Sequence, residues 1–185
     1  MPAYVAFLRA INLGQTRKFA KGDLVAATQA AGATAVQSYL TSGNVLLTSP
    51  RTSAAEVAAD LESAYEADRG FAVPTIVFPL AELPQLVATG DELLAANGPA
   101  AQFAVSLYAQ APEPAAVEAA HALAQEQRDA GEVADQVFVR DRAAFVLLRV
   151  DVHSSQLLRE RAFADLGQGT MRTHDVLRRL CARWA

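Results

Sequence analysis

The sequence predicts an α+β fold of two ferredoxin-like halves, the second incomplete or modified, with extra helices at the C-terminal end. Three observations support this prediction. Short apolar runs and segments of helical periodicity follow one another in the order βαββαβ between residues 4 and 78. The turn-forming cluster Asn97-Gly98-Pro99 then interrupts the chain. A similar but less complete series follows, so we expect one half at residues 1–98 and the other at residues 99–185.

The first elements are a strand, a helix and a hairpin. The run from Tyr4 to Arg9 is apolar with aromatic members, which is typical of a buried strand. From Asp23 apolar residues recur at helical spacing as far as Gly32, and glycine commonly ends helices. Two short apolar runs, 36–40 and 45–48, flank Thr41-Ser42-Gly43-Asn44. Because Gly and Asn tolerate positive φ, these runs predict two strands joined by a tight turn.

A second helix and a fourth strand complete the first half. Ser53 and Glu56 have the spacing of a capping box, and an apolar stripe of helical period follows them as far as Gly70. Residues 73–78 then predict a strand. We expect two short helical segments before the turn cluster, one from Leu80 that is interrupted at Pro84 and one around Leu93.

The second half repeats this rhythm less clearly. It is predicted to contain a strand at 103–108, a helix from Pro112 to Arg128, a hairpin at 136–150, a helix from about Ser154 and a last helix from about His174 to Trp184. No segment is identified as the equivalent of the last strand of the first half. The second half is therefore expected to lack that strand.

Composition and charge exclude several classes of protein. The chain has 185 residues, of which 52% are hydrophobic, and no apolar run approaches the roughly 20 residues that cross a bilayer. The N-terminal residues lack the pattern of a secretory signal, and Cys181, the single cysteine, cannot form an internal disulfide, so a cytoplasmic protein is expected. A net charge of −4 disfavours a dedicated nucleic-acid binder. His121, His153 and His174 lack partners at metal-ligand spacing, and neither a P-loop nor a G-x-G-x-x-G motif is present, so no metal or other cofactor is predicted.

Two motifs carry a resemblance to a known family. They are Phe7-Leu8-Arg9-Ala10-Ile11-Asn12-Leu13-Gly14 and Tyr39-Leu40-Thr41-Ser42-Gly43-Asn44-Val45. They resemble the L-R-G-I-N-V-G-G and Y-L-x-S-G-N-V segments of a bacterial family named domain of unknown function 1697, with Ala10 and Gln15 in place of two glycines. The family's T-x-R-N-W-like segment, which opens its last helix, is matched by Thr170-Met171-Arg172, followed here by Thr173 and His174. The resemblance implies two ferredoxin-like units and no particular reaction.

The topology of a βαββαβ unit brings the two motifs together. The loop after the first strand and the turn between the second and third strands lie at the same sheet end, and the first and third strands are neighbours. The residues expected to converge there are Arg9, Asn12, Gly14, Ser42, Gly43 and Asn44. A guanidinium, two amides, a hydroxyl and exposed backbone N–H groups suit a phosphate or carboxylate. Arg17 and Lys18 would add positive charge beside them.

The same residues also have structural interpretations. The two asparagines can bond the loop backbone, Arg9 can pair with Asp68, and Arg17, Lys18 and Lys21 can form a solvated face. Arg172 can either reach this site from the second half or bridge the two halves.

The sequence is compatible with three functions. The leading hypothesis is a protein that binds a small molecule with an anionic group. The alternative is an enzyme acting on a phosphorylated or nucleotide-like substrate, for which Ser42 lacks an evident partner histidine. RNA binding through the sheet is less favoured, because the predicted central strands lack paired aromatic residues for base stacking. The sequence does not predict the oligomeric state.

Overall fold

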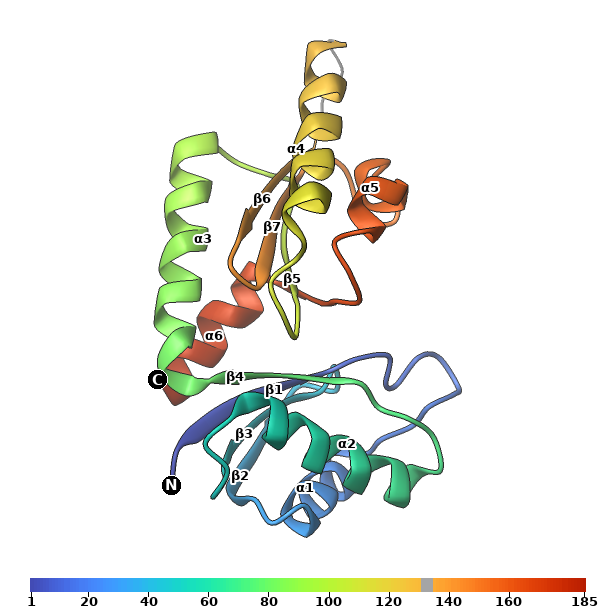
Figure 1. Ribbon diagram of the computed structural model, residues 1–185, viewed down its shortest axis with the longest axis vertical. Helices are drawn as coiled ribbons and strands as arrows, with labels where there is room; N and C mark the ends of the chain where they lie inside the picture. The colour runs from blue at the N-terminus through green and yellow to red at the C-terminus, as the bar shows by residue number, and fades with distance from the viewer. Residues whose placement is uncertain (131–134) are drawn as a thin grey trace. The chain divides into compact units, whose positions relative to one another are not determined.

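The computed structural model describes residues 1–130 and 135–185 and divides into two compact units. The first unit consists of Met1–Pro84 and Leu180–Ala185, and the second of Gln85–Arg179. Each unit contains a four-stranded antiparallel sheet (Figure 1). The predicted α+β class with two ferredoxin-like halves is therefore confirmed. Within the described ranges, no helix has both the length and the apolar character needed to cross a bilayer.

The first unit has the βαββαβ order that the sequence predicts. Its elements are β1 (Ala3–Leu8), α1 (Lys21–Ala30), β2 (Thr34–Tyr39), β3 (Asn44–Thr48), α2 (Ala54–Arg69) and β4 (Thr75–Pro79). The strand order is β2-β3-β1-β4, and β1 is antiparallel to both of its neighbours. The two helices lie together on one face of this sheet (Figure 1).

The core of the first unit lies between this sheet and its helices. Tyr65 of α2 is fully buried, and its hydroxyl lies 2.8 Å from the Thr28 hydroxyl of α1. The Tyr65 ring also meets Phe19 edge to face, with the ring centroids 5.3 Å apart. Burial raises the pKa of Tyr65 well above its usual range, so the phenol stays neutral and joins the two helices as a hydrogen-bonding group.

The limits of α2 follow the signals in the sequence. Ser53 is the N-cap residue, although its side chain makes no capping hydrogen bond. Gly70 ends the helix with φ +73°, and its N–H donates to the Glu66 carbonyl at 2.8 Å. The capping-box pattern therefore predicts where the helix begins, but not the hydrogen bond.

The second unit repeats the strand order of the first. Its elements are β5 (Gln102–Leu107), α4 (Pro114–Asp129), β6 (Gln136–Arg140), β7 (Ala143–Leu148), α5 (Arg161–Ala164) and β8 (Thr170–Thr173), with the order β6-β7-β5-β8. The short η2 (Leu157–Arg159) precedes α5. This unit is a modified copy of the plan, because α5 has four residues where α2 has sixteen.

The expectation that the second half lacks its last strand was wrong. The segment Thr170-Met171-Arg172 does not open the last helix but forms β8, which pairs antiparallel with β5. Helix α6 (His174–Trp184) begins immediately after it. The strand has four residues, and the two that are buried, Thr170 and Arg172, are polar, so it shows no apolar alternation.

The prediction of two short helices after β4 was also wrong. After the single turn η1 (Leu80–Glu82), one continuous helix, α3, runs from Leu83 to Asn97. Pro84 is its second residue, where the missing N–H has no intrahelical acceptor, so the proline does not interrupt the helix. The turn at residues 97–99 separates α3 from β5. The predicted domain boundary between residues 98 and 99 stays a prediction. The division of the structure into two compact units does not test it.

Candidate functional site

The two motifs predicted to converge do meet at one end of the first sheet. Phe7 of β1 pairs with Asn44 of β3, and the Leu8 N–H donates to the Gly43 carbonyl at 2.9 Å. Beyond the strand, the Asn12 side chain donates to the Thr41 carbonyl at 2.7 Å. We call residues 9–18 together with residues 41–44 the loop cluster.

Asn12 organises the first segment of the loop cluster. Its Nδ2 donates to the carbonyls of Phe19 and Thr41 at 3.1 Å and 2.7 Å, and its Oδ1 accepts from the Phe19 N–H at 2.9 Å. Its own N–H donates to the Arg17 carbonyl, and its φ is +54°. Because these bonds use both amide atoms, Asn12 holds the loop in shape, as the structural interpretation predicts.

Gly43 and Asn44 build the turn between β2 and β3. Gly43 has φ +78° and is packed so closely that a Cβ there would lie 2.7 Å from Leu8 Cβ. Asn44 is 0% exposed, and its Nδ2 donates to the Tyr39 carbonyl at 2.9 Å and to Ser42 Oγ at 3.1 Å. Ser42 itself is exposed. Of the three turn residues, Ser42 therefore places its side chain at the surface.

Two cations of the loop cluster are held by neutral backbone groups. Arg17 donates through Nε to the Ala10 carbonyl and through Nη2 to the Ala72 carbonyl, and its guanidinium lies over the Phe71 ring at 4.6 Å. Lys18 donates to the Gly14 carbonyl. Neither forms an ion pair within the part of the chain that the structure describes. Both positive charges therefore lie beside backbone carbonyls, with no ion-paired carboxylate among the described residues.

The remaining predicted residues of the first unit lie beside these cations. Gly14 is exposed with φ +53°, and Arg9 is half-buried, with its backbone N–H donating to the Pro74 carbonyl at 2.9 Å. The suggested partner of Arg9, Asp68, accepts from Arg69 Nε at 2.6 Å.

Arg172 belongs to the second unit. It lies on β8, is 7% exposed, and donates through Nη1 to Thr170 Oγ1 at 2.9 Å and to the Met171 carbonyl at 2.8 Å. Burial lowers its pKa to about 10, because desolvation disfavours the charged form. A role for Arg172 at the loop cluster stays a prediction.

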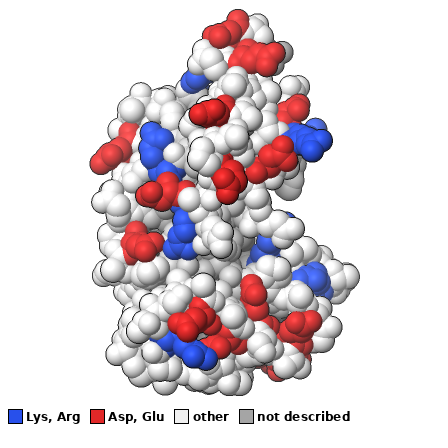
Figure 2. All heavy atoms as spheres, viewed as in Figure 1, with Lys and Arg blue, Asp and Glu red and all other residues white. Residues whose placement is uncertain are grey.

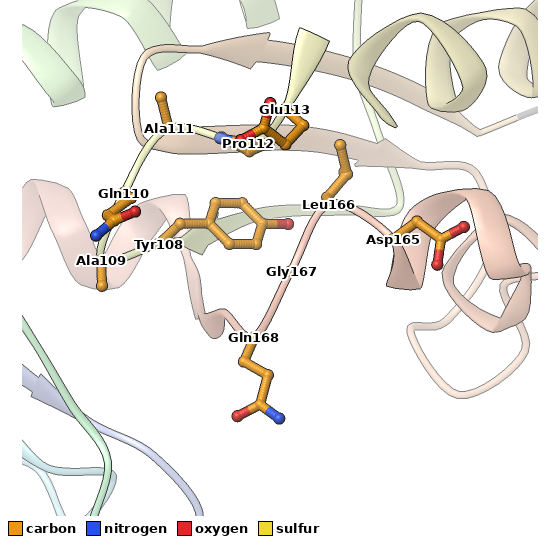
Figure 3. Close-up of a pocket in the computed structure, with 10 residues that line it drawn as sticks. All are labelled: Tyr108, Ala109, Gln110, Ala111, Pro112, Glu113, Asp165, Leu166, Gly167 and Gln168. Carbon is orange, nitrogen blue, oxygen red and sulfur yellow. The ribbon is translucent and has the colours of Figure 1, made fainter. Parts of the chain in front are cut away.

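The corresponding end of the second sheet carries a hollow that the sequence did not reveal. It measures about 320 Å³ and lies between the loop after β5 and the loop before β8, with Tyr108 between them (Figure 3). Its charged lining residues in the described chain are Glu113 and Asp165. Two carboxylates repel an anion, so this hollow does not duplicate the chemistry of the loop cluster. To recognise the hollow from the sequence, one would have to know that the loop at residues 109–113 lies beside the loop at residues 165–168. These loops come together because β8 pairs with β5, and the sequence does not predict β8.

Neither a basic surface, on the face that Figure 2 shows, nor a group of metal ligands is found among the described residues. On the described residues of the face in Figure 2, acidic and basic side chains are mixed in each unit and form no continuous basic surface. Among the residues that the structure describes, no group of three or more His, Cys, Asp or Glu side chains is placed to hold a metal ion.

Comparisons with known proteins place the chain in a family. No curated protein sequence matches it. A solved structure, described as that of the conserved bacterial protein SP0830 from Streptococcus pneumoniae, is similar over 98% of this chain and 97% of that chain, with a TM-score of 0.62 and 18% identity. At this identity the likeness shows the fold alone. The family model described as protein of unknown function, DUF1697, matches residues 1–138, which include both motifs of the loop cluster. The chain therefore belongs to the DUF1697 family.

Proposed function

We propose that the protein binds a small molecule carrying a phosphate or carboxylate group, in the cytoplasm, and that the loop cluster is the binding site. The observation that supports this proposal is the position of Arg17 and Lys18. Arg17 donates to the Ala10 carbonyl in the Asn12 loop and to the Ala72 carbonyl before β4, and Lys18 donates to the Gly14 carbonyl. Asn12 in turn contacts Thr41 in the turn at residues 41–44. Positive charge that no carboxylate neutralises attracts an anion, and the two hydrogen bonds of Arg17 reduce the side-chain entropy that its ligand contact would cost.

Both cations keep donors for a ligand. Arg17 uses Nε and Nη2 for the backbone, so Nη1 can donate to an oxygen of an anion. Lys18 makes one hydrogen bond in the described structure, and an ammonium group has three donors. A hydrogen bond to a charged group contributes about 1.5–3 kcal/mol, so loss of either side chain should weaken binding about tenfold or more.

A thermal-shift panel of inorganic phosphate, citrate and phosphate monoesters tests this proposal with three variants of the full chain. We expect the anion that raises the melting temperature of the wild type to raise it less in Lys18→Ala and Arg17→Ala. Arg51→Ala is the matched control, because Arg51 lies in the same unit and pairs with Asp60 at 2.8 Å, away from the loop cluster.

The Lys18 variant is the more informative of the two. Lys18 is exposed, whereas Arg17 also holds the loop, so Arg17→Ala is expected to lower the melting temperature without ligand. Equal responses of Lys18→Ala, Arg51→Ala and wild type to every anion would refute the proposal.

The two alternative functions have less support. The hydroxyl of Ser42 accepts from the side-chain amide of Asn44 at 3.1 Å, and a neutral amide is neither a general acid nor a general base, so this contact does not activate the hydroxyl. For RNA binding, the first sheet would need exposed aromatic rings. Tyr39 instead packs against Trp184, with ring centroids 6.5 Å apart, and lies under the Arg183 guanidinium at 5.8 Å.

A further inference from the structure

A second hollow lies in the second unit, between helix α4 and the edge strand β6. It measures about 190 Å³ and is lined by His121, Ala124, Arg128, Val137, Phe138 and Arg140. His121 and Arg128 are seven residues apart on α4, which places them two turns apart on one helix face. Arg140 is the last residue of β6, the strand packed against that helix.

The charged groups of this hollow are all basic among the described residues. Arg128 donates to the side-chain oxygen of Gln125, and Arg140 donates to the Val139 carbonyl at 2.8 Å, so both guanidinium groups bond to neutral acceptors. His121 Nε2 accepts a long hydrogen bond, 3.5 Å, from the Val139 N–H. The hollow therefore combines two permanent positive charges with one imidazole that can become a third.

The hollow is large enough for a small anion. Its volume of about 190 Å³ exceeds the space that one phosphate or sulfate group needs. Arginine side chains bind phosphate oxygens through paired N–H donors.

We propose that the hollow between α4 and β6 binds a small dianion of the phosphate or sulfate type, held by Arg128 and Arg140 and coupled to protonation of His121. This site is independent of the loop cluster. The anion stands between the two guanidinium groups and the imidazole, and its charge stabilises the imidazolium.

The charge of His121 supplies a direct readout. Without an anion, burial and the positive charge of Arg140 lower the pKa of His121. The charged side chains that line the hollow with it are Arg128 on its own helix and Arg140 on the packed strand, within the described chain, and Glu118 lies one helical turn before His121 on α4. A bound dianion opposes both guanidinium charges, so it should raise the pKa of His121. By linkage, binding should tighten about tenfold as the pH falls from 8 to 5.

The test is a proton NMR titration of the histidine ring resonances of the full chain between pH 5 and 8, with His121→Gln assigning the signal. Sulfate is the probe, because it remains a dianion over this range, and sodium chloride at equal ionic strength is the reference. We expect sulfate to raise the pKa of His121. Arg140→Ala should raise the pKa of His121 without sulfate and should abolish the further rise with it.

Three further variants complete the test. Arg128→Ala should also abolish the sulfate response, whereas Arg161→Ala, an exposed arginine of the same unit that pairs with Asp165, should retain it. Arg17→Ala should retain it as well, so failure here and failure of the loop cluster can be told apart. The site is refuted if sulfate leaves the His121 titration unchanged in wild type, or if the response survives in both Arg128→Ala and Arg140→Ala.

Discussion

Replacing Gly90 by alanine is expected to destabilise the protein, although the substitution lies inside helix α3. In an open helix, alanine is more stable than glycine by about 0.5–1 kcal/mol. Here a Cβ at position 90 would lie 2.2 Å from Cε1 of His174 and 2.6 Å from its Nδ1. That ring is 2% exposed, bonded to Asp91 at 2.7 Å and packed on Phe103 with centroids 4.7 Å apart, so it has little freedom to move. We expect a net loss of about 1–3 kcal/mol.

The sign of the effect should reverse when the ring is removed. In a His174→Ala background, Gly90→Ala should stabilise the protein by about 0.5–1 kcal/mol, because only the helix propensity remains. Urea denaturation of the four proteins of this double-mutant cycle measures the difference. Equal losses in both backgrounds would show that the His174 ring is not the obstacle.

Replacing Gly43 by alanine, in the turn of the loop cluster, is also expected to lower the free energy of unfolding strongly. Its φ of +78° is unfavourable for alanine by about 1–2 kcal/mol. The new Cβ would also lie 2.7 Å from Leu8 Cβ and 2.9 Å from Ile11 Cδ1. Leu8 Cβ is fixed to the backbone of β1 and cannot turn away, so the total loss should reach about 2–4 kcal/mol.

Gly32→Ala separates the two contributions to this loss. Gly32 lies in the same unit and has a similar φ, +82°, but a Cβ there would meet no atom within 4 Å. Its loss in urea denaturation should therefore be about 1–2 kcal/mol, the backbone contribution alone. If Gly32→Ala and Gly43→Ala lose the same free energy of unfolding, close packing at Gly43 has no energetic role.

The order of elements in the first unit was predictable because each has a strong local signal. Apolar runs, helical periodicity and the residues Gly32, Gly43 and Gly70 fix the strands, helices and turns, and the topology then brings the Asn12 loop to the turn at Ser42. Such signals are absent from β8, whose two buried side chains, Thr170 and Arg172, are polar. The continuity of α3 depends on the position of Pro84 relative to the start of the helix.

The candidate sites were predictable only in part. A sequence shows that Asn12 and Asn44 have amides, but not that these amides bond to backbone carbonyls rather than face a ligand. Likewise, the spacing of His121 and Arg128 is visible in the sequence, whereas their approach to Arg140 depends on the packing of α4 against β6. Side-chain partners across separate elements are set by tertiary packing and have no local signature.

The loop cluster as an anion site is the central claim, and a titration of backbone amide resonances with inorganic phosphate tests it most directly. We expect saturable shifts for residues 12–18 and 41–43, with an affinity about tenfold or more lower in Lys18→Ala than in wild type and unchanged in Arg51→Ala. Shifts that never saturate, or that spare these residues in the wild type, would contradict the claim.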